Sequence, residues 1–140
     1  MSEANKSEFK FSGFQILKSQ IEKTDIEKVV SDLSIDFIPR GELNKGTKKF
    51  NLYLEVQISN SEKTFLINII AVGFFEYSIE SGDDKLKNYF YVNAPAILFP
   101  YIRAYISTLT NLSGYSPVNL PTINFSFIAD TLKRNTKELL

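Results

Sequence analysis

The feature that most constrains this chain is a long stretch that carries almost no charge. Between Asn88 and Ile128, forty-one residues include a single charged side chain, that of Arg103. The water-exposed surface of a folded protein carries charged side chains at a much higher density. The stretch must therefore be largely buried, in the chain's own core, in a membrane or against another protein.

A membrane-spanning helix does not fit this stretch. Pro95, Pro100, Gly114, Pro117 and Pro121 interrupt it, and Asn, Ser and Thr are frequent between them. No apolar run reaches the about 18 residues that a spanning helix needs. We therefore expect no direct insertion into a membrane.

The first half of the stretch predicts a helix that ends near Asn111 and bends at its proline end. Its apolar residues recur at three- and four-residue spacing, and they leave few sides for water. In a chain of 140 residues the second wall for such a helix is expected to be another subunit. Burial within one subunit is the alternative. The expected interface residues are Leu98, Ile102, Arg103, Tyr105, Ile106 and Leu109.

Elsewhere, apolar and polar residues alternate with the period of half-buried strands. A slip near Gly13 indicates a β-bulge in the first strand, and we expect Pro39 and Gly41 to end the second. Residues 125–136 favour a short closing helix, residues 1–8 are expected to be disordered, and 133–140 to form a flexible tail. The expected strands cover residues 9–21, 33–37, 50–58 and 65–79, the last two as an antiparallel hairpin.

Composition removes several classes of function. The chain has sixteen basic and sixteen acidic residues, so nothing in its net charge favours nucleic acid. It contains neither cysteine nor histidine, which excludes thiol nucleophiles, Cys/His zinc sites and a Ser-His-Asp triad. We expect no cofactor and no catalytic residue. The polar first ten residues lack the apolar core of a signal peptide and predict a cytoplasmic protein.

Two short motifs suggest chemistry but fit it poorly. Residues 41–48 have the glycine spacing of a phosphate-binding loop, but they end in Thr-Lys instead of Lys-Ser/Thr and lead into a strand. Asp32 and Asp36 are expected on one face of a strand, roughly 13 Å apart at 3.3 Å per residue, which is too far for an acid/base pair. They form instead a candidate patch for a basic partner, or simply exposed acids on a solvated face.

The uncharged stretch closely resembles one family. The resemblance is to the helix and the following loop of SecB-type export chaperones. It is carried by the segment Asn-Ala-Pro-Ala-Ile-Leu-Phe-Pro-Tyr-Ile-Arg, which ends at Arg103, by the later segment Gly-Tyr-Ser-Pro and by the pair Asn-Phe. Val72-Gly-Phe-Phe75 resembles the end of that family's third strand. The matching positions are Pro95, Leu98, Phe99, Pro100, Tyr101, Arg103, Gly114, Pro117, Leu120, Asn124 and Phe125.

The resemblance implies an α+β fold, in which a long helix and a short C-terminal helix pack on a four-stranded antiparallel sheet. It implies a homotetramer, a dimer of dimers with the long helices between the sheets. It also implies binding of unfolded polypeptides without ATP, for export or for guarding an antitoxin. Asp32 and Asp36 match acids by which the family docks on the translocase motor, whereas a third acidic position of export members is Asn68 here.

The client surface is expected on apolar side chains that the core pattern does not require. Phe74 lies on the less apolar side of its strand, and Phe127 falls off the main stripe of the closing helix. Core packing is the alternative. The expected client contacts are Phe74, Tyr115, Leu120, Phe125, Phe127 and Ile128.

Two other functions compete with a holdase. One is an oligomeric adaptor whose apolar face serves a single permanent partner, and the other is a binder of a small molecule inside the sheet. A holdase suppresses aggregation of several unrelated unfolded proteins, whereas an adaptor protects none of them.

Overall fold

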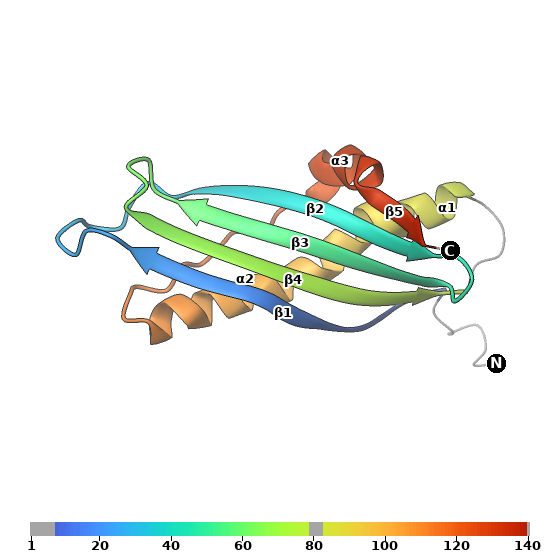
Figure 1. The fold of residues 1–140 in the computed structure, drawn as a ribbon, viewed down its shortest axis with the longest axis horizontal. Coiled ribbons are helices and arrows are strands. Elements are labelled where there is room, and N and C mark those ends of the chain that lie inside the picture. Colours follow the sequence, from blue (N-terminus) through green and yellow to red (C-terminus); the bar gives the residue numbers. More distant parts are fainter. Residues whose placement is uncertain (1–7, 79–82, 140) are drawn as a thin grey trace.

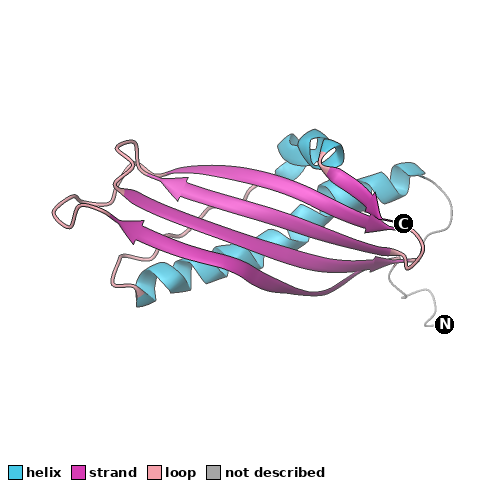
Figure 2. Ribbon diagram, in the orientation of Figure 1, coloured by secondary structure: helices cyan, strands magenta, loops and turns pink. Residues whose placement is uncertain are grey.

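The computed structural model describes residues 8–78 and 83–139. It confirms an α+β fold, in which one long helix crosses a face of an elongated sheet (Figures 1 and 2). Within these residues the sheet has five strands, one more than the four expected, in the order β1-β4-β3-β2-β5, and the added β5 pairs in parallel instead of antiparallel. The elements are β1 Phe9–Lys23, β2 Ser34–Asn44, β3 Lys49–Ser59, β4 Phe65–Tyr77, α1 Asp83–Asn88, the π-helical turn η2 Tyr89–Asn93, α2 Ala94–Leu112, the 3-10 turn η3 Phe125–Ile128, α3 Ala129–Arg134 and β5 Thr136–Leu139.

The β3–β4 hairpin supplies the floor of the core. Every second residue of β3 turns toward α2, and these five side chains are fully buried, as the alternation of the sequence predicts. The inward side chains of β4 are buried as well. The five residues of β3 are Phe50, Leu52, Leu54, Val56 and Ile58.

The inner face of α2 packs on this floor within a single chain. Leu98, Ile102 and Ile106 each have an exposed fraction of 0% without any second subunit. Assigning these three side chains to a subunit interface was therefore wrong, because the chain's own sheet already covers them. The alternative, a helix buried within one subunit, holds for this face of α2. Tyr105 and Leu109 are only half-buried.

β1 pairs along its whole length with β4 and slips register twice, between Phe11 and Gly13 and between Ile16 and Lys18. The first slip is the expected bulge, and Gly13 has a φ of 134°, a backbone conformation that side chains rarely tolerate. The bulged strand curves along the sheet in Figure 1. The Gly13 slip thus marks a real break in the strand's alternation.

β2 continues through Pro39 and Gly41, so the expectation that these residues end the strand is wrong. The Gly41 N–H donates to the Asn135 carbonyl, so the odd-numbered residues of β2 direct their backbone groups away from β3. Pro39 is one of them, and its missing N–H costs no bond to β3. Its carbonyl accepts from Asn135 Nδ2 at 3.1 Å.

The C-terminal segment differs from the flexible tail that the sequence predicts. Thr136–Leu139 forms β5, which pairs in parallel with Gly41–Asn44 at the edge of the sheet. Residues 1–7 of the expected disordered start lie outside the described residues. Glu8 is described, and its carboxylate contacts Lys85 Nζ at 3.0 Å.

We predict that Gly41→Ala destabilises the fold. A Cβ at this position would lie 2.7 Å from Thr136 Oγ1 and 2.8 Å from Phe50 Cε1, both in packed surroundings. Such overpacking costs about 1–3 kcal/mol of the free energy of unfolding, which denaturant titration measures. Gly46→Ala, in the turn after β2, is the matched control. Equal midpoints for the two variants would show that the β2–β5 junction adapts.

Candidate functional site

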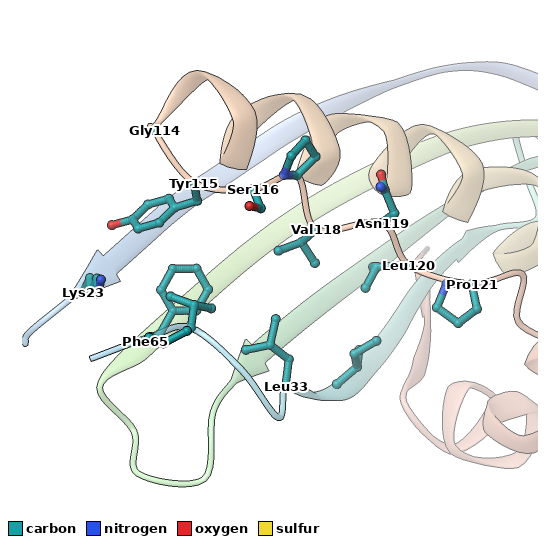
Figure 3. Close-up of a pocket in the computed structure, with 14 residues that line it drawn as sticks. Lys23, Leu33, Phe65, Gly114, Tyr115, Ser116, Val118, Asn119, Leu120 and Pro121 are labelled. Atoms are coloured by element: carbon teal, nitrogen blue, oxygen red, sulfur yellow. The ribbon is translucent and has the colours of Figure 1, made fainter. Parts of the chain in front are cut away.

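A groove with a volume of about 610 Å³ opens at the end of the sheet where β1 ends and β2 begins. Two loops bound it, residues 24–33 between β1 and β2 and residues 113–124 after α2. Figure 3 shows Tyr115, Val118 and Leu120 on the α2 side, facing Phe65 and Leu33 across the opening. Its apolar lining consists of Val29, Val30, Leu33, Ile35, Phe65, Tyr115, Pro117, Val118, Leu120 and Pro121.

The wall formed by residues 113–124 is anchored to α2. The buried Thr110 hydroxyl donates to the Ile106 carbonyl and accepts from the Val118 N–H, both at 2.9 Å. The Tyr115 N–H donates to the Thr110 carbonyl at 3.0 Å. Arg103, the one charged side chain of the uncharged stretch, donates to Thr122 Oγ1 at 3.3 Å. This wall is therefore preorganised.

The opposite wall, residues 24–33, holds apolar side chains in water. Ile26 is 88% exposed and Val29 82% exposed, although both are large apolar residues. The loop is tied to the β3–β4 turn by the bond from the Thr24 N–H to the Thr64 carbonyl and by an ion pair between Lys28 and Glu62 at 3.1 Å. Clustered exposed apolar residues beside a groove are typical of a surface that another molecule covers.

The edge of β2 next to the groove is open. Ile35 and Phe37 direct their backbone groups away from β3, as Gly41 does, but β5 pairs only with Gly41–Asn44. Within the described part of the chain, no hydrogen bond reaches the backbone of Ile35 or Phe37 from that side. An extended peptide can pair with such an edge irrespective of its sequence.

The structure brings together only some of the six expected client contacts. Tyr115 and Leu120 line the groove. Phe125 and Ile128 are 2% and 4% exposed and belong to the core, where Phe125 packs edge-on against Phe37 and Phe99. Their assignment as client contacts was wrong, because η3 turns both side chains inward.

The remaining two expected contacts lie apart from each other. Phe74 pairs with Asn51 on the face of the sheet opposite α2, away from the groove, so it does not join the other residues. Phe127 is 62% exposed and packs against Phe37, beside the open edge of β2. Phe127 therefore stays a candidate.

Sequence reasoning missed the 24–33 wall of the groove. Val29 and Val30 lie in a charged segment whose sequence predicts only a loop. Ile26 belongs to no helical or strand-like apolar periodicity. The one available signal was an apolar pair in a loop with no strand or helix to place it in a core. The loop lies opposite Tyr115 only because of the way the whole chain folds, and the sequence of residues 24–33 alone does not indicate this position.

The two acidic residues do not share a strand face as expected. Asp36 is exposed on β2 and pairs with Gln57, on the face of the sheet away from α2. Asp32 precedes β2 in the loop, with a φ of 54°. Asn68 lies next to Gln57 in the same row, and its buried Oδ1 accepts no hydrogen bond in the described part of the chain.

None of the helices within residues 8–78 and 83–139 combines the length and the hydropathy that crossing a membrane requires. A sheet backed by one long helix, with an open apolar groove and an open strand edge, defines an α+β protein built to bind other polypeptides. The model of the family described as preprotein translocase subunit SecB matches residues 22–134, so the chain belongs to the SecB family.

Individual proteins are similar to this chain over most of its length. The protein-export protein SecB of Orientia tsutsugamushi (strain Ikeda) is 30% identical over 128 residues, which is 89% of this chain and 75% of that protein. The uncharacterized protein MJ0357 of Methanocaldococcus jannaschii is 32% identical over 130 residues, 85% of this chain and 81% of that one.

A solved structure shares the fold. The Mycobacterium tuberculosis Rv1957 SecB-like chaperone, in complex with a ChAD peptide from the Rv1956 HigA1 antitoxin, superposes with a TM-score of 0.68 at 19% identity. The match covers 83% of this chain and 88% of that chain.

Proposed function

We propose that this protein is an ATP-independent holdase of the cytoplasm, which binds unfolded polypeptides through the groove between residues 24–33 and 113–124. Membership of the SecB family supports this function, and the observation that carries the site is the open apolar groove beside the unpaired edge of β2. The clients are precursors for export, or an antitoxin as in the Rv1957 complex. No catalytic step is involved.

The mechanism combines two kinds of contact. Apolar client side chains cover Ile26, Val29 and Tyr115, at about 25 cal/mol for each Å² of apolar surface removed from water. The client backbone pairs with Ile35 and Phe37, which fixes an extended conformation without reading sequence. Phe127, beside the same edge, extends the contact surface. A folded protein keeps most of its backbone paired and most of its apolar side chains buried, so it offers far fewer of these contacts than an unfolded one.

The outer face of α2 supports assembly into a homotetramer. Tyr101 is 45% and Leu112 80% exposed, and Ala104 and Thr108 lie exposed between them at helical spacing. This face carries no charge. We propose that it packs against other copies, with several grooves on one particle giving avidity for a long client.

Ala104→Glu tests this assembly. A glutamate in the centre of the face places buried charges at every symmetry-related contact, so we expect the tetramer seen by light scattering to dissociate at micromolar concentration. Gln57→Glu, on the opposite face of the sheet, should leave the mass unchanged. A wild-type monomer at the same concentration would overturn the proposal.

Docking on the translocase motor is proposed for the outer face of the sheet. Exposed Asp36 supplies one acid, and Asp32 a second from the neighbouring loop. Asn68 supplies no third carboxylate, and its side-chain oxygen is buried in the sheet. Charge complementarity there is accordingly weaker than with three acids.

A dedicated adaptor is the competing function, and promiscuity separates the two. We expect the protein to suppress the aggregation of several unrelated unfolded proteins, measured by light scattering after dilution from denaturant. An adaptor would protect none of them.

A further inference from the structure

A second pocket, with a volume of about 240 Å³, lies at the opposite end of the sheet from the groove. The turn after β2, the end of β4, α1 and β5 meet there (Figure 1). Its apolar part is formed by Leu43, Leu86 and Phe90, and Lys45, Lys87 and Glu138 provide the charges. No role in the proposed holdase activity involves this pocket.

Tyr77 gives the pocket an unused hydrogen-bond donor. The residue is 8% exposed, and its ring packs edge-on against Phe90 at 5.1 Å. No hydrogen bond joins its hydroxyl to another group in the described part of the chain. The hydroxyl is not among the buried side-chain atoms that lack a partner there, so it is open to the solvent of the pocket. Burial raises the pKa of Tyr77 above 10, so the hydroxyl keeps its proton at neutral pH.

The charges near this hydroxyl favour an anion. Lys45 and Lys48 lie close enough to lower the pKa of Tyr77, against the opposing effect of Glu138. Lys45 Nζ lies 3.2 Å from Glu138 Oε1, so the positive charge of Lys45 and the negative charge of Glu138 offset each other. Lys87, on the rim, adds a further positive charge to the lining of the pocket.

The volume limits the ligand to a small group. At about 30 Å³ for each water, 240 Å³ corresponds to roughly eight water molecules, the size of a short branched acid. We propose that the pocket binds a carboxylate attached to a short apolar group. The carboxylate accepts from the Tyr77 hydroxyl near Lys87, and the apolar group packs against Leu43, Leu86 and Phe90. A free small acid and the C-terminus of a polypeptide ending in an apolar residue both have this chemistry.

Titration of the full-length, ¹⁵N-labelled protein with 4-methylpentanoate tests the proposal. We expect saturable shifts of backbone amide signals around Tyr77 and Phe90, and a Kd at least about tenfold higher for 4-methylpentanamide, which has the same shape without the charge. N-acetyl-leucine, with N-acetyl-leucinamide as its control, distinguishes the sources. Binding of N-acetyl-leucine favours a chain end, and binding of 4-methylpentanoate alone favours a free acid.

Two variants locate the contact. Tyr77→Phe removes only the donor and should raise the Kd for the acid about tenfold, and Lys87→Gln, at an exposed position, about threefold. Tyr53→Phe, on the outer face of the sheet, should change nothing. Equal affinity for acid and amide, or an unchanged Kd in Tyr77→Phe, would overturn the proposal whether or not the holdase activity is found.

Discussion

Replacing Ile26 and Val29 together by serine is expected to abolish most client protection while leaving the fold intact. Both side chains are more than 80% exposed, so the substitution removes almost no packing from the free protein. In the complex, each contributes about 1.5 kcal/mol if a client buries it, so the pair accounts for roughly a hundredfold in affinity. The measurement is the protein concentration that halves aggregation of an unfolded client.

Ile38→Ser is the matched control for this variant. Ile38 is 46% exposed on the outer face of β2, so it resembles Val29 in chemistry but lies on the other side of the sheet from the groove. Its substitution should leave client protection unchanged. Phe127→Ser adds a third measurement, with an intermediate loss expected. If Ile38→Ser weakens protection as much as the double variant, the client surface lies on the outer face instead.

The sheet was predictable because its signal is local. A two-residue alternation such as Phe50–Ile58 has one physical solution, with the apolar face buried, and all five apolar residues are indeed fully buried. The prediction that Pro39 and Gly41 end the second strand failed because the effect of such residues depends on the side of the strand to which their backbone N–H points. That orientation is set by the neighbouring strands, here β3 and β5.

The groove was only half predictable for a related reason. Tyr115 and Leu120 belong to a proline-rich loop whose similarity to SecB-type chaperones marks it directly. Val29 is brought to the groove by the turn between β1 and β2, and no periodicity records that position. Phe125 and Phe127 are two residues apart in η3, yet one is 2% and the other 62% exposed. With three residues per turn in a 3-10 helix, side chains two positions apart point to different sides, so the stripe that excludes Phe127 places Phe125 in the core.

The uncharged stretch carries the largest stability prediction. Ile102→Ala should lower the free energy of unfolding by about 2–5 kcal/mol, because it opens a cavity between α2 and the sheet at a side chain that is 0% exposed. Tyr101→Ala, one residue earlier, removes a larger side chain that is 45% exposed and packs within the chain against the rings of Phe11 and Phe14. It should cost the isolated chain less and should weaken subunit assembly instead.

The dependence of Tm on protein concentration separates these two faces of α2. Ile102 packs on the sheet of its own chain, so its substitution destabilises each chain whether or not it is assembled. The Tm of Ile102→Ala should therefore fall by the same amount at all protein concentrations. Loss of an assembly contact is counteracted by mass action, so the deficit of Tyr101→Ala should shrink as concentration rises. A deficit in Ile102→Ala that shrinks in the same way would return Ile102 to the subunit interface. The chain's own sheet would then not suffice to bury α2.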